Sequence, residues 1–215
     1  MRMLRRFVFL LLMLAAVQLN AEQIVLDQDD FKHIHFKRIT PNQVSFNDDA
    51  IHFDVNKSAS FLLLAFDDIR IIRRVSFQWQ ADGTLNKNSI EHEMSRKGDD
   101  AWLRVGLIIE GQPDHVPEPL LPRWMKQVRQ TLKHQFNKMV YLIPDALHTP
   151  GDTWKSPFSS DVDMISVGSR VMDDGWKQAS YEFTSPQNVV GLWIMADGDN
   201  TGSIFESRLR NLVGE

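Results

Sequence analysis

Strict alternation of apolar and polar side chains is the feature of this sequence that most restricts its fold. In residues 75–80 every odd position is apolar and every even position is polar, which predicts a strand with one buried face. Residues 50–55 and 102–110 repeat the pattern more loosely. Further strand-like segments are residues 33–39, 60–66, 139–143, 162–167, 178–183, 189–195 and 204–209. Roughly ten short strands, separated by Gly, Pro, Asn and Asp, predict a mainly β sandwich or barrel.

One segment has a different period. Between about residues 119 and 138, apolar side chains such as Trp124, Val128 and Phe136 recur at steps of three and four, and arginines and lysines lie between them. This spacing predicts one inserted amphipathic helix with a basic face. We expect its apolar stripe to pack on the sheet. The alternative is a surface that docks on a membrane or a partner protein.

The first residues have the pattern of a secretory signal peptide. Arg2, Arg5 and Arg6 precede an apolar run over residues 7–17, and a small residue, Ala21, suits the cleavage site. The run has about 11 residues, whereas a membrane-spanning helix needs about 20. We therefore expect residues 1–21 to be removed. The remaining domain, residues 22–215, would act in the periplasm of a Gram-negative bacterium or outside the cell.

Charge and cysteine content narrow the possible partners. The whole chain has a net charge of −4, and removing residues 1–21 removes three arginines and no acids, so the mature chain is more acidic still. An acidic chain without a basic run argues against nucleic acid as a partner. The sequence contains no cysteine, so its core must suffice without disulfides. We expect a monomer with a single domain.

The C-terminal run from Asp197 to Gly202 concentrates oxygen ligands. Asp197, Asp199 and Asn200 are the candidate metal ligands, and calcium is the candidate cofactor, because this ion takes six to eight oxygens from short loops rich in Asp, Asn and Gly. Arg208 stands where an EF-hand would have its bidentate glutamate, so the loop is not an EF-hand. The alternative is that Asp and Asn cap a turn between two strands.

Two other segments carry candidate ligand-binding residues. Asp99 and Asp100 form an acidic turn just before the strand that contains Arg104, and such groups make charge-assisted hydrogen bonds. Trp154 lies in residues 149–158, which read as a long loop, and an aromatic ring amid polar groups can stack on a sugar. The alternative for Trp154 is a plug that covers one end of the sandwich.

Signals for catalysis are weak. His33 and His35 lie two apart on an expected strand and so share a face, as a zinc or copper site requires, but no third ligand is near them in the sequence. The sequence has no cysteine nucleophile, no Gly-x-Ser-x-Gly elbow, no phosphate loop and no dinucleotide fingerprint. We therefore assign no catalytic residue.

The order of the motifs resembles a bacterial family known as domain of unknown function 3047. The motifs are Ser58-Ala59-Ser60, then Lys97-Gly98-Asp99-Asp100 with the Arg104 strand, Pro150-Gly151, Ser156-Pro157-Phe158, and residues 191–195 followed by 197–201. The chain departs from the family in having Gly198 where a threonine is usual. The resemblance implies an exported jelly-roll sandwich, similar to carbohydrate-binding and galactose-binding-like domains. It implies no particular activity.

Three functions are compatible with these features. The leading hypothesis is a non-catalytic binding module for a glycan or another polar envelope component, which would use Asp99, Asp100, Arg104 and Trp154. The second is a glycan hydrolase or lyase that uses Asp99 or Asp100 with Asp197 or Asp199 as acid and base. The third is an envelope assembly or interaction protein that docks through its basic helix.

Overall fold

The computed structural model describes residues 21–113 and 116–215, so the predicted signal peptide lies outside the described residues apart from Ala21. The described residues form two helices, α1 (Ile90–Glu93) and α2 (Arg123–Thr131), together with single 3-10 turns at Gln28–Asp30 and Glu118–Leu120. The strands are β1 (Glu22–Gln23), β2 (Phe31–His35), β3 (Gln43–Asn47), β4 (Ala50–Asn56), β5 (Ala59–Thr84), β6 (Ala101–Glu110), β7 (Phe136–Pro144), β8 (Thr153–Ser156), β9 (Ser159–Val167), β10 (Ser169–Val171), β11 (Lys177–Asp197) and β12 (Ile204–Gly214).

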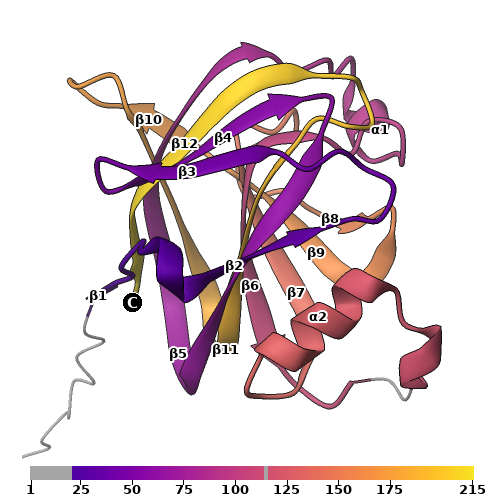
Figure 1. Cartoon of the computed structure of the whole chain (residues 1–215). Coiled ribbons are helices and arrows are strands. Elements are labelled where there is room, and N and C mark those ends of the chain that lie inside the picture. The colour runs from indigo at the N-terminus through magenta and orange to yellow at the C-terminus, as the bar shows by residue number, and fades with distance from the viewer. Residues whose placement is uncertain (1–20, 114–115) are drawn as a thin grey trace, which may run out of the picture.

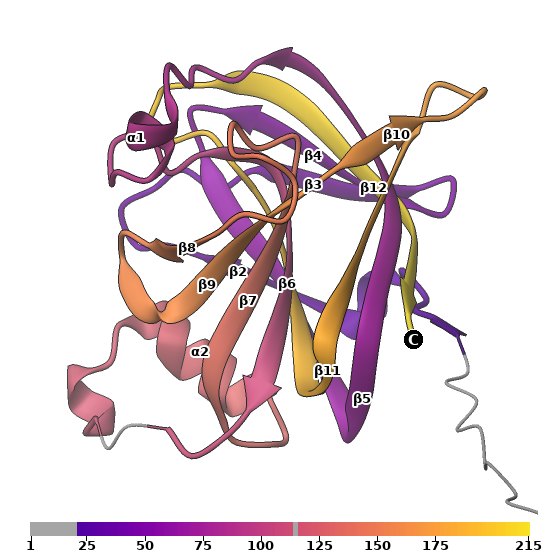
Figure 2. The ribbon, with the colours of Figure 1, turned by 180° about the vertical axis from the view of Figure 1, so that it is seen from behind.

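Two long strands organise the sheet. β5 has 26 residues and β11 has 21, and they pair antiparallel along most of their length. The pairing register shifts between Glu182 and Gln187 and again between Val189 and Gly191. Such irregularities let a paired ladder bend. Each of the two strands therefore continues from one layer of the molecule into the other (Figures 1 and 2).

The two layers share these strands and differ in their neighbours. In the first layer, the second half of β5 pairs with β12, which is followed outward by β4 and β3. In the second layer, the first half of β5 pairs with β2 on one side, while β11 leads on to β6, β7, β9 and β8. The β7–β9 pair is parallel, and the other pairs are antiparallel. The predicted fold class, a mainly β sandwich with an inserted amphipathic helix, is confirmed; the inserted helix is α2, and the single turn of α1 was not predicted.

Alternating residues of the strands fill two separate cores. Phe53 of β4, Phe77 of β5 and Leu107 of β6 belong to the core between the layers. Phe61 of β5 and Trp193 of β11 belong to a second core on the outer face of the second layer. The second layer is therefore buried on both faces, whereas the first layer has an outer face in contact with solvent.

Helix α2 covers the outer face of the second layer (Figure 1). Val128 is 1% exposed, and Trp124 packs edge-on against Phe61 and Trp193, whose rings stack with centroids 3.3 Å apart. The apolar stripe thus packs on the sheet, and the docking alternative loses the surface that it requires. The helix is shorter than the range of about 119–138, because the chain becomes extended at Leu132 and residues 136–138 belong to β7. None of the helices formed by the described residues is long and apolar enough to cross a membrane.

The stack of Phe61 on Trp193 leads to a prediction about stability. Substitution Phe61→Ala removes a fully buried ring from the second core, so we expect the free energy of unfolding to fall by about 3 to 5 kcal/mol. The matched control is Phe158→Ala, because Phe158 is 55% exposed and its removal should cost less than about 1 kcal/mol. Urea unfolding of the three proteins checks this, and similar losses in both variants would contradict the packing described.

Candidate functional site

The two acidic turns meet at one end of the second layer. Strands β6 and β11 are antiparallel, and Asp197 at the end of β11 lies opposite Ala101 at the start of β6. The turn that contains Asp99 and Asp100 immediately precedes Ala101, and the loop of residues 198–203 immediately follows Asp197. Segments about a hundred residues apart in the sequence therefore lie side by side, a juxtaposition on which the sequence was silent.

Arg104 joins the two turns. One terminal nitrogen of its guanidinium donates to the Asp99 carboxylate at 2.9 Å and to the Asp99 carbonyl oxygen at 2.9 Å, and the other forms an ion pair with Asp197 Oδ2. Arg104 is 3% exposed. Burial alone would lower the pKa of Arg104, but the two carboxylates outweigh it and raise this pKa above its ordinary value. The guanidinium therefore stays charged inside the protein.

Asp100 connects the loop of residues 198–203, which we call the acidic loop, to the start of β6. Its Oδ1 accepts hydrogen bonds from the backbone and side-chain nitrogens of Asn200, each at 3.1 Å. Its Oδ2 accepts from the backbone N–H of Thr201 at 2.8 Å and from the Thr201 hydroxyl. The Asn200 amide also donates to Asp199 at 3.2 Å. Asn200 thus acts as a hydrogen-bond donor that holds the loop closed, and Asp100 is its main acceptor.

The cluster contains more negative than positive charge. Carboxylate oxygens of Asp100, Asp197 and Asp199 lie within 4.8 Å of one another, and Asp99 adds a fourth carboxyl group. Against these four, Arg104 brings one positive charge, which it shares between Asp99 and Asp197. Burial raises the pKa of Asp197, and Asp100 and Asp199 raise it further against the effect of Arg104. Burial also raises the pKa of Asp99. Asp99 and Asp197 are therefore costly to ionise.

Trp154 lies in a second buried group next to this cluster. The residue is in strand β8, within the segment that read as a loop, and it is 7% exposed. Its indole ring stacks on the imidazole of His148, with centroids 3.9 Å apart. His148 Nδ1 lies 2.8 Å from a Glu93 oxygen, and Glu93 is paired with Lys87. Burial alone would raise the pKa of Glu93, but Lys87 and His148 lower it below its ordinary value.

Burial decides what these side chains can contact. Asp99, Asp100, Arg104 and Trp154 are between 1% and 7% exposed, and the contacts described above are to one another or to other buried or half-buried groups. A ligand at the surface cannot reach them unless this end of the sandwich opens. Their role in ligand binding stays a prediction, and in this conformation the cluster acts as a structural network.

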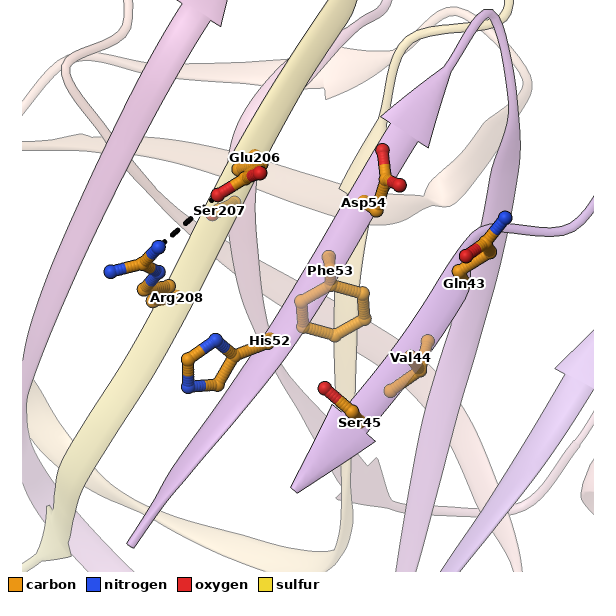
Figure 3. A pocket seen from close by; sticks show the side chains of 9 residues that line it. All are labelled: Gln43, Val44, Ser45, His52, Phe53, Asp54, Glu206, Ser207 and Arg208. Carbon is orange, nitrogen blue, oxygen red and sulfur yellow. Dashed lines mark hydrogen bonds and ion pairs between the residues drawn. The ribbon is translucent and has the colours of Figure 1, made fainter. Parts of the chain in front are cut away.

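Accessible polar pockets lie instead on the outer face of the first layer. Two shallow neighbouring pockets, of about 270 and 370 Å³, share Glu206 and Arg208. Figure 3 shows the first of them, with side chains from β3, β4 and β12. The polar side chains that line the two pockets are those of Gln43, Ser45, His52, Asp54, Gln80, Asp82, Lys177, Glu206, Ser207 and Arg208. Ser207 is buried, and we call the remaining nine residues the polar strip.

The strand register arranges the polar strip in rows. Glu206 of β12 lies directly opposite Asp54 of β4 on one side and Asp82 of β5 on the other, so three carboxylates form one row. In the next row Arg208 lies between His52 and Gln80. Directly opposite side chains have Cβ atoms about 5 Å apart, and like charges there are destabilising. No sequence motif marks these residues, because they come from three separate strands.

His33 and His35 lie side by side, as their spacing predicts. Their rings are 4.4 Å apart, and His33 Nε2 lies 2.8 Å from the Ser60 hydroxyl, which can donate to an unprotonated ring. Burial and the neighbouring His35 lower the pKa of His33 to about 4. Among the described residues, no third ligand completes a metal site with His33 and His35.

The fold and these sites define a mainly β sandwich with a buried ionic network and an exposed polar strip. The family model described as "Protein of unknown function (DUF3047)" matches residues 29–213, so the chain belongs to this family, as the order of its motifs predicts. Among solved structures, the chain is similar to a loop-swap mutant of Necallimastix patriciarum Xyn11A, with 11% sequence identity and a TM-score of 0.38 over 92% of this chain and 96% of that one. None of the curated proteins matches the chain.

Arg104 gives a first prediction for the site. Substitution Arg104→Ala leaves Asp99 and Asp197 buried without their cation, so we expect the free energy of unfolding to fall by about 3 to 5 kcal/mol. Arg104→Lys keeps the charge but lacks the fork that reaches both carboxylates, so its stability should lie between those of the wild type and Arg104→Ala. Arg208→Ala is the control, because its ion pair is exposed and worth about 1 kcal/mol or less. A loss below about 1 kcal/mol in Arg104→Ala would contradict this account.

His33 gives a prediction about pH. Because its folded pKa of about 4 lies below the ordinary value of 6.5, the stability that neutral His33 contributes is complete above pH 6.5 and is lost as the pH falls toward 4. The side chain is partly exposed, so solvent screening reduces this loss to roughly 1 to 2 kcal/mol. The free energy of unfolding, measured with urea at several pH values from 7.5 to 4, should fall less steeply with decreasing pH in His33→Gln than in the wild type. Equal slopes would rule out this contribution.

Proposed function

We propose that this protein is a non-catalytic binding module whose ligand is a neutral or amine-bearing glycan, or a similar polar envelope component. The ligand would lie across the polar strip on the outer face of the first layer. A periplasmic or secreted location, which is part of this proposal, is supported by the signal-peptide pattern in residues 1–21.

The observation that carries the proposal is the row of three carboxylates. Asp54, Glu206 and Asp82 stand in register on three neighbouring strands, although like charges in such positions disfavour the folded state. Glu206 and Arg208 form one exposed ion pair at 3.1 Å, which leaves the other two carboxylates of the row without that cation. A ligand that donates hydrogen bonds or carries positive charge would relieve this repulsion.

The neighbouring row supplies the opposite kind of group. Arg208 and Gln80 can donate hydrogen bonds, and His52 can donate or accept. Sugar hydroxyls both donate and accept, so one glycan can satisfy the acidic row and the donor row together. Because strands of a paired sheet hold these groups, little order has to be gained when the ligand binds.

The charge of the polar strip favours some glycans over others. A uronic acid or a sulfated sugar would bring negative charge to the acidic row and would be repelled. A neutral sugar can donate its hydroxyl protons to the carboxylates, and a protonated amino sugar adds a charge-assisted hydrogen bond. The proposal therefore ranks glucosamine oligosaccharides above neutral ones, and neutral ones above those that contain uronic acids.

The hydrolase or lyase alternative stays open at the buried cluster. Two of its carboxyl groups, those of Asp99 and Asp197, have raised pKa values, as a general acid requires. Both are buried, so a substrate would need the acidic loop to open. Release of new reducing or unsaturated ends from any oligosaccharide would favour this alternative over the binding module.

Glu206→Gln tests the proposal. The variant should bind glucosamine oligosaccharides roughly tenfold more weakly in isothermal titration calorimetry, because it loses a charge-assisted acceptor. Its stability should stay within about 0.5 kcal/mol of the wild type, since loss of the exposed ion pair is offset by relief of repulsion. A weakened ligand affinity with unchanged stability separates a binding role from a structural one.

The matched control is Glu182→Gln. Glu182 is also an exposed strand glutamate paired with an arginine, at 3.1 Å from Arg73 Nε, but it does not line the polar strip. This variant should bind as the wild type does. Equal affinity for glucosamine and uronic acid oligosaccharides, or equal weakening in both variants, would refute the proposed role of the acidic row.

A further inference from the structure

One oxygen in the buried cluster has no hydrogen-bond partner. Asp197 Oδ2 is held by Arg104, but Asp197 Oδ1 is buried and accepts no hydrogen bond from the described residues. Asp197 itself is 4% exposed. A buried carboxylate oxygen without a donor is destabilising, and native proteins satisfy such atoms with a hydrogen bond, a water molecule or an ion.

Two further carboxylates lie close to the Asp197 carboxylate. Oxygens of Asp100, Asp197 and Asp199 lie within 4.8 Å of one another. Asp100 already accepts hydrogen bonds at both of its oxygens. It therefore contributes negative charge to the cluster but no free ligand atom. Asp199 is half-buried and accepts from the Asn200 amide at 3.2 Å. The open acceptor capacity of the cluster is therefore concentrated on Asp197 and Asp199.

The size and chemistry of this arrangement suit calcium. Calcium binds carboxylate oxygens at about 2.3 to 2.6 Å, so two oxygens on one ion lie no more than about 5 Å apart. Magnesium holds its ligands at about 2.1 Å in strict octahedral geometry and retains several waters. A site made of one buried carboxylate at the end of β11 and one half-buried carboxylate on the loop that follows suits the larger and more adaptable ion.

We propose that Asp197 Oδ1 and the Asp199 carboxylate bind a calcium ion, with Asp100 adding negative charge behind them and water completing the coordination. Arg104 does not compete for this position, because it is engaged with Asp99 and with the other oxygen of Asp197. The ion supplies the positive charge that the fold lacks there. Calcium binding stabilises the connection between β11 and β12 and does not depend on the glycan-binding proposal.

The test is thermal unfolding of the purified, chelator-treated protein at pH 7.5 with added CaCl₂ or MgCl₂ at constant ionic strength. A ligand that binds only the folded state raises the unfolding midpoint, by roughly 5 to 10 °C at about 100-fold excess over Kd for a chain of this size. We expect this rise with calcium, its reversal by chelator, and a clearly smaller rise with magnesium. Calorimetry should give one ion per chain.

Variants locate the site. Asp199→Asn keeps a side chain of the same shape and should weaken calcium binding at least tenfold, whereas Asp68→Asn, an exposed position elsewhere on β5, should leave it unchanged. Asp197→Asn should fold without calcium, because it removes excess buried negative charge. It should also lose the calcium-dependent rise of the unfolding midpoint, because it removes a carboxylate ligand. Absence of a calcium-dependent shift in the wild type, or an unchanged affinity in Asp199→Asn, would overturn the proposal.

Discussion

The antiparallel pairing of β5 with β11 is the interaction on which the rest of the structure depends. Both strands are long enough to belong to both layers, so their ladder joins the layers and encloses the central core. The ladder ends where Asp197 lies opposite Ala59 of β5 and Ala101 of β6. Because three strand ends meet there, the Asp99–Asp100 turn and the acidic loop are brought together at the same edge.

Arg104 helps to fix the register of β6 against β11 at this edge. It lies on the outer face of the second layer, opposite Met195 and 5.7 Å from the Tyr141 ring centroid. A one-residue slip of β6 against β11 would move every side chain to the other face, and the guanidinium would enter the apolar central core without Asp99 or Asp197. Because the fold tolerates the Arg104 charge in only one register, this residue helps to specify that register. The cost of removing the charge from water limits how much it adds to the free energy of unfolding.

The alternating pattern predicted the fold class but divided two strands that are continuous. Residues 60–66 and 75–80 belong to β5, and the polar residues between them, including Asp67 and Asp68, read as a break although they face solvent where the strand bends. Residues 50–55 lie in β4 as expected, but β3 and its hairpin with β4 were missed, because Asp48 and Asp49 take positive φ where glycine would have marked the turn. The sequence also named most residues of the ionic network. Their juxtaposition and their burial depend on contacts between segments far apart, which no local pattern reports.

The two groups of carboxylates differ in how strongly solvent screens the repulsion between their charges. In the row formed by Asp54, Glu206 and Asp82, water and salt screen the repulsion, so its cost is small. The buried cluster has little such screening, so the charges of Asp99 and Asp197 depend on their ion pairs with Arg104. The acidic loop leads directly into β12, the strand that carries Glu206 and Arg208. Order in the buried cluster therefore helps to position β12 and the exposed row that this strand carries.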